Sequence, residues 1–139
     1  MTVLFIIGTC ILVGLVWLLV ASIDRYSYMC YKYKFFSWSN FILIFFSNLS
    51  LAFGYKWYTN AQIEGGDLLN GEILIFLGAA GLLCIIYQNF KYTSFSLGLF
   101  GSFVQMVVFA MLSVFFFIAI LFVIALLFET KPVYNINND

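Results

Sequence analysis

Two amide side chains, Asn48 and Gln105, lie well inside long apolar stretches of this chain of 139 residues. A buried amide without a partner is costly in hydrocarbon, so each amide is expected to hydrogen-bond to another helix or to face water. The chemistry that these residues can do is recognition and packing rather than the breaking of bonds.

Small and hydroxyl residues accompany both amides at helical spacing. Ser50 shares a broad side of a helix with Asn48, and the later stretch repeats small or polar residues at spacings of three, four and eight. Such residues allow two helices to approach closely. The candidate contacts between helices or between subunits are Asn48, Ser50, Gly98, Ser102, Gln105 and Ser113. Packing within one chain, contact between subunits and the lining of a pore are all open interpretations.

A second group of candidates lies in the run from Tyr26 to Phe35, where tyrosines are interleaved with lysines. A cation near a membrane surface contributes about 1 kcal/mol of attraction to anionic headgroups, and aromatic and basic side chains also anchor protein interfaces. The candidate contacts with lipid or with a partner protein are Arg25, Tyr28, Tyr31, Lys32, Tyr33 and Lys34. The competing interpretation is a plain interfacial elbow between two helices.

The sequence offers few of the residues that catalysis needs. The sequence has no His, and its three cysteines, Cys10, Cys30 and Cys84, lack the CxxC spacing of a metal or redox site. Sequence motifs of hydrolases, metalloproteases and phosphate-binding loops are absent. We therefore expect a protein that is not an enzyme, with no catalytic residue, no metal and no cofactor. The formal net charge of zero argues against nucleic acid as a partner.

The composition indicates where the candidate residues act. Hydrophobic residues make up 65% of the chain, aromatic residues 22% and charged residues only 9%. The surface of a small soluble domain is about 25–35% charged, so these few charges could not cover a soluble monomer. A membrane protein is expected.

Four apolar segments can position the candidates. A spanning helix needs about 20 largely apolar residues, and we predict spans at about residues 3–23, 40–58, 73–90 and 97–128. The expected fold is an all-α integral membrane protein, a bundle of four transmembrane helices that forms a single domain over residues 1–139 without a soluble domain. No basic residue precedes the first span, which favours a retained helix over a cleaved signal peptide.

The last segment is unusually long. Residues 95–128 contain no charge and correspond to roughly 50 Å of helix. Because Met106 to Phe128 contains no Gly, Pro, Asn or Asp, a turn within it is not expected. We predict one helix, whose extra length is accommodated by tilt or by protrusion from the membrane.

Basic residues determine the expected orientation. The first and third connections hold more of them than the opposite side does: Arg25, Lys32, Lys34 and Lys91 against Lys56 and Lys131. Short loops richer in Lys and Arg face the cytoplasm. We therefore expect a multi-pass protein of the bacterial inner (plasma) membrane with both termini outside.

Assembly is the function that these residues favour. Small-residue faces, two intramembrane amides and one basic aromatic elbow predict a noncatalytic polytopic subunit that forms homo-oligomers in the lipid bilayer. Such a subunit anchors, senses for or positions a partner protein. Its size and topology are typical of small subunits of bacterial phage-defence, envelope-stress or toxin-immunity systems. The alternative is an oligomeric ion channel or pore lined by Ser, Asn and Gln.

Overall fold

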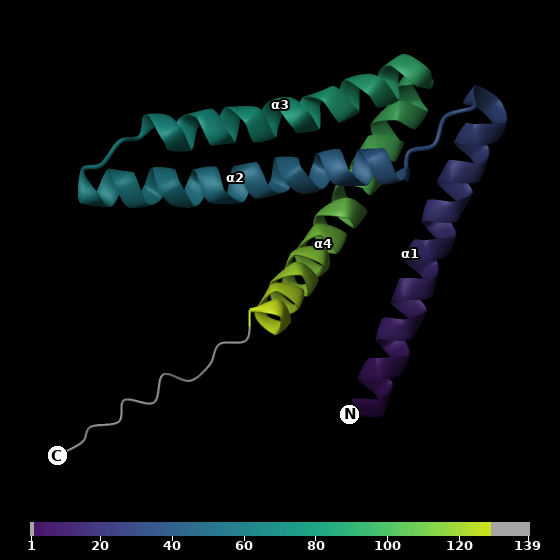
Figure 1. The fold of residues 1–139 in the computed structure, drawn as a ribbon. Helices are drawn as coiled ribbons and strands as arrows, with labels where there is room; N and C mark the ends of the chain where they lie inside the picture. The colour runs from purple at the N-terminus through teal and green to yellow at the C-terminus, as the bar shows by residue number, and fades with distance from the viewer. Residues whose placement is uncertain (1, 129–139) are drawn as a thin grey trace.

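The structure is a computed structural model that describes residues 2–128, with side chains from residue 6 onward. The described chain is helical, with four helices: α1 (Thr2–Tyr31), α2 (Trp38–Glu64), α3 (Leu69–Tyr92) and α4 (Phe95–Leu127) (Figure 1). The predicted tail, with Lys131, lies outside the described residues.

Three helices of the described residues are long and apolar enough to cross a membrane, which confirms the predicted helices and is consistent with a membrane protein. These candidate spans are Ile6–Tyr31, Leu69–Tyr92 and Phe95–Leu127. The second predicted span falls on α2, which is not among them, because α2 carries several polar and charged residues along its length. A bundle of four spans therefore stays a prediction.

The helices extend beyond the predicted spans. No Gly or Pro interrupts residues 24–31, so α1 continues to Tyr31 and ends where Lys32 adopts a left-handed φ of 56°. At the end of α2, Gly65 takes a left-handed φ of 71°, a conformation that glycine adopts without a Cβ clash. The connections are therefore shorter than predicted and comprise residues 32–37, 65–68 and 93–94.

The long final segment forms one continuous helix of 33 residues, as predicted. At its start the Ser94 hydroxyl oxygen accepts the backbone N–H of Leu97 at 3.4 Å, which is the usual role of serine at an N-cap. Beyond Gly101 the helix contains neither glycine nor proline, so its backbone hydrogen bonding is not interrupted.

α2 and α3 form an antiparallel hairpin that meets α4 at one end (Figure 1). α4 contacts both helices of the hairpin, and Figure 1 shows it inclined to them rather than parallel. α1 lies at the edge of the molecule and packs only lightly against α4. The first and third connections consequently lie close together, whereas the second connection lies at the far tip of the hairpin.

Glycines allow α2 and α3 to approach to backbone contact. A Cβ atom added to Gly54 would lie 2.8 Å from the backbone nitrogen of Ile75, and one added to Gly78 would lie 2.7 Å from the carbonyl oxygen of Ser47. These distances are shorter than van der Waals contact, and the opposing atoms belong to backbone that cannot rotate away. The hairpin therefore depends on the missing side chains of its glycines.

Aromatic rings join the hairpin to α4. The buried core combines Phe41 and Ile44 of α2 with Ile85 of α3 and Phe109 of α4. The rings of Phe41 and Phe109 meet edge to face with centroids 5.3 Å apart, a favoured geometry for aromatic pairs. The three helices thus share one core, to which α1 contributes little.

We predict that Gly54→Ala destabilises the hairpin, because the new methyl group would press on the backbone of α3. Overpacking of this kind costs about 1–3 kcal/mol. The measurement is the free energy of unfolding in detergent micelles. Gly66→Ala is the matched control, since its Cβ would lie 3.6 Å from Ala61, an ordinary contact. Equal stability of the two variants would contradict the prediction.

Candidate functional site

A buried polar network lies where the first and third connections meet. It is formed by polar groups of the first connection and of α2, α3 and α4, and comprises Tyr33, the carbonyl of Phe35, Asn40, Asn89, Ser102 and Gln105. Hydrogen bonds between side chains are most valuable where water does not compete for the same groups. The polar network therefore fixes the relative positions of three helices and one connection.

Asn89 is the centre of the polar network and is fully buried, with 0% of its surface exposed. Its Oδ1 accepts the Tyr33 hydroxyl at 2.7 Å, while its Nδ2 donates to Ser102 Oγ at 2.8 Å and to Gln105 Oε1 at 2.7 Å. Both amide protons and one acceptor position are thus satisfied. One side chain of α3 links the first connection to α4.

The backbone carbonyl of Phe35 accepts hydrogen bonds from two side-chain amides of the polar network. It accepts the Nε2 of Gln105 at 2.5 Å and the Nδ2 of Asn40 at 3.0 Å, although Gln105 is 70 residues distant in sequence. A carbonyl in a short connection has no helical partner, so in an apolar setting it must find other donors. Two amides meet this requirement.

The ring of Phe35 fixes the same connection sterically. It is fully buried and lies against Gly101 of α4, where an added Cβ would be 2.5 Å from the ring. The ring of Tyr33 meets it edge to face at 5.3 Å. The connection is therefore held by hydrogen bonds at its backbone and by packing at its side chains.

The Tyr33 hydroxyl remains a proton donor at neutral pH. Burial raises the pKa of Tyr33 above its ordinary value near 10, and the hydrogen bond from Asn40 lowers it by less. The neutral phenol donates to Asn89, so the polar network carries no formal charge.

Ser27 is an exception to this pairing. Its side chain is fully buried near the end of α1, and its hydroxyl has no hydrogen-bond partner among the described residues. A buried hydroxyl without a partner costs about 1–3 kcal/mol. The unpaired Ser27 hydroxyl therefore stabilises the fold less than a paired hydroxyl at the same position would.

The first group of predicted site residues divides in two. Ser102 and Gln105 lie in the polar network, and Gly98 is buried on the same side of α4. Ser113 is also buried, but its hydroxyl donates to the Phe109 carbonyl of its own helix at 2.6 Å. The remaining two, Asn48 and Ser50, are half-buried on α2 and lie outside the polar network.

Sequence reasoning missed the amides at the helix ends. Asn40 and Asn89 lie at the margins of their apolar segments, where an amide is ordinarily solvated. The signal that could have found them is topological: Asn40 begins one span, Asn89 ends the next, and an antiparallel pair brings these ends together.

The second group of predicted site residues gathers at the same end of the molecule. The Nζ atoms of Lys32 and Lys34 each lie 5.3 Å from the centre of the Tyr28 ring, within the range of a cation–π interaction. Arg25 and Tyr31 are exposed, whereas Tyr33 turns inward. We call the four cations of this region the basic end: Arg25, Lys32, Lys34 and Lys91.

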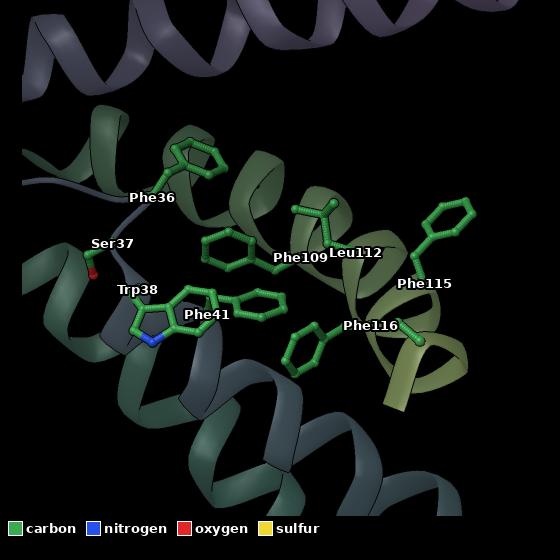
Figure 2. Close-up of a pocket in the computed structure, with 9 residues that line it drawn as sticks. Phe36, Ser37, Trp38, Phe41, Phe109, Leu112, Phe115 and Phe116 are labelled. Atoms are coloured by element: carbon green, nitrogen blue, oxygen red, sulfur yellow. The ribbon is translucent and has the colours of Figure 1, made fainter. Parts of the chain in front are cut away.

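An aromatic pocket of about 480 Å³ lies beside the polar network, between the start of α2 and the middle of α4. Figure 2 shows Trp38 and Phe41 of α2 facing Phe109 and Phe116 of α4 across it. Its lining offers apolar contact and few polar atoms, so the pocket suits hydrocarbon rather than a polar ligand. Within residues 2–128 no cluster of three metal-ligating side chains is present.

No protein-family model, curated protein or solved structure matches this chain. The arrangement of its own residues is therefore the basis for inferring a function.

We predict that Gln105→Leu destabilises the protein by about 1–2 kcal/mol, because the Phe35 carbonyl and one N–H of Asn89 would each lose a partner. The free energy of unfolding in micelles measures the effect. Gln88→Leu is the matched control, because Gln88 is half-buried beside Asn89 and outside the polar network. A loss of stability in the control that equals the loss in Gln105→Leu would show that hydrogen bonding is not the cause.

Proposed function

We propose that this chain is a noncatalytic polytopic subunit of the bacterial inner membrane, which forms homo-oligomers through α1 and positions a partner protein there. The settings that fit are phage-defence, envelope-stress and toxin-immunity systems. The observation that carries the proposal is the isolation of α1 from the rest of its own chain.

α1 is long, apolar and almost unpartnered. Every side chain from Ile6 to Leu19 is exposed in the single chain, and α1 packs only lightly on α4. The other three helices share an aromatic core and the polar network. A helix with so few internal contacts is available for a neighbouring subunit.

Small residues on α1 support a protein neighbour. The small residues Cys10 and Gly14 are four residues apart and share one face with the larger Ile7 and Leu18, here called the outer face. A Cβ added to Gly14 would meet nothing within 4 Å, unlike the glycines between α2 and α3. Small residues favour close helix–helix contact in membranes, whereas contact with lipid gains nothing from them.

We predict that Gly14→Leu weakens self-association about ten-fold while leaving the fold of each chain intact. The measurement is energy transfer between labelled copies in vesicles at increasing dilution in lipid. Gly8→Leu is the control, because Gly8 is equally unobstructed but lies outside the outer face.

In a chain with Cys30→Ser and Cys84→Ser, Cys10 should cross-link two copies.

A wild-type chain that stays monomeric at every dilution and copurifies with no other protein would contradict the proposal. If Gly8→Leu and Gly14→Leu weakened self-association equally, the contact between subunits would not lie on the outer face.

We also propose that α2 crosses the membrane. α2 and α3 pair in antiparallel fashion, so if α3 crosses, α2 is its return path. The last residues of α1 and α3 lie at the basic end, so α2 and α4 both begin on that side of the membrane. The inclination of α4 to the hairpin requires both to tilt, and spanning helices tilt by up to about 40°. The basic end then faces the cytoplasm.

This topology predicts opposite labelling of two cysteines. Cys30, at the basic end, should react with a membrane-impermeant maleimide only in inverted vesicles. Ile63→Cys, near the tip of the hairpin and 83% exposed in the wild type, should react in intact cells. The assay uses chains that retain one cysteine each. Reaction of both from one side would show that α2 does not cross.

A pore is the weaker alternative. Its polar lining would have to come from the amides and hydroxyls of the spans, yet Ser102 and Gln105 hydrogen-bond to Asn89 within one chain. Asn48 and Ser50 are the polar candidates on α2 that remain half-exposed.

A further inference from the structure

A groove of about 410 Å³ runs between α1 and α4, distinct from the outer face of α1. Leu12, Val16 and Val20 line it from α1, and Phe109 and Leu112 line it from α4. Its surface is almost wholly apolar. Figure 2 shows α1 passing above α4, with Phe36 reaching from the connection toward the space between them.

The size of the groove favours an acyl chain over a helix. From Leu12 to Val20 the groove follows α1 for about 12 Å. A helical segment of that length and about 10 Å across occupies roughly 900 Å³, more than twice the volume of the groove. A flexible hydrocarbon chain is much thinner and can follow the groove along its length.

The depth of the groove matches the interior of one leaflet. At about 1.5 Å per residue, Val20 lies about 12 Å and Leu12 about 24 Å along α1 from Tyr28. A headgroup layer of about 6 Å and half of a hydrocarbon core of about 30 Å place the midplane about 21 Å below the surface. With Tyr28 at headgroup level, the groove begins within the hydrocarbon of that leaflet and ends about 3 Å past the midplane.

The charge of the connection that carries Phe36 favours an anionic headgroup. Lys32 and Lys34 converge on the Tyr28 ring, and Asp24 is the one acidic residue among residues 24–37. Asp24 Oδ1 accepts the backbone N–H of Phe36 at 3.1 Å, which ties the lysine-bearing connection to α1. Phe36 itself lines the groove. Headgroup contacts and acyl-chain contacts are therefore joined by one short segment.

We propose that the groove between α1 and α4 binds one acyl chain of an anionic phospholipid whose headgroup contacts Lys32 and Lys34. Each lysine contributes attraction to the phosphate and to any further headgroup charge. Leu12, Val16 and Val20 lie on a different face of α1 from Cys10 and Gly14, whereas Trp17 lies at the edge between the two faces. An acyl chain along Leu12, Val16 and Val20 therefore leaves Cys10 and Gly14 free for a second subunit. The lipid site does not depend on the proposed self-association.

Trp17 lines the groove and can report its occupant by fluorescence. The experiment uses the full chain with Trp38→Phe and Trp57→Phe, in vesicles containing phosphatidylglycerol or phosphatidylcholine brominated at the middle of the same acyl chain. Phosphatidylglycerol should quench Trp17 at an at least ten-fold lower mole fraction. Each of Lys32→Gln and Lys34→Gln should reduce that preference about five-fold, and the double variant should abolish it.

Lys56→Gln is the control, since Lys56 is an exposed cation on α2, away from the basic end. It should leave the preference unchanged. Equal quenching by the two lipids would overturn the proposal. Quenching that disappears when the protein is concentrated in the membrane would also overturn it, because a second copy of the chain would then fill the groove. The preference should persist in Gly14→Leu, which separates the lipid site from subunit contact.

Discussion

The carbonyl of Phe35 imposes the constraint on which the rest of the structure depends. It belongs to a connection without regular secondary structure, yet it is surrounded by apolar helices and must receive donors. Gln105 and Asn40 supply them, and Asn89 then binds Gln105 and Ser102, which brings α3 against α4. Replacing one partner leaves others unsatisfied, so the polar network acts as a unit rather than as separate bonds.

Close packing stabilises the contacts between helices that the polar network does not reach. The glycines at the contact of α2 with α3 bring the two backbones together, and aromatic rings of α2 and α4 fill the space that remains. Gly101 accommodates the ring of Phe35 in the same way, so the connection that carries the constrained carbonyl is also fixed sterically. Close packing and buried polar pairing therefore stabilise the same junction, whereas α1 is left largely outside both. This asymmetry between α1 and the other helices motivates the proposed role in assembly.

Much of the fold could be predicted from apolar segment length, because the bilayer demands long uninterrupted helices. The continuous α4 followed from its lack of turn-forming residues. Helix ends were harder, since α1 continues through a polar, aromatic run that contains no breaker. Gln105 stood out because it lies deep in an apolar stretch, but Asn89 did not, because an amide at the end of a span is ordinarily solvated. Only the three-dimensional junction shows that Asn89 is covered by its neighbours.

The 70-residue separation between Phe35 and Gln105 has a consequence for biosynthesis. The α2–α3 hairpin is complete when residue 92 has been made, but Asn89 then has only Tyr33 as a side-chain partner. Its amide protons acquire acceptors once the first turns of α4 emerge and deliver Ser102 and Gln105. A nascent chain interrupted before that point lacks both of these acceptors for the Asn89 side chain. Completion of the helical hairpin and completion of its polar pairing are therefore separate stages of synthesis.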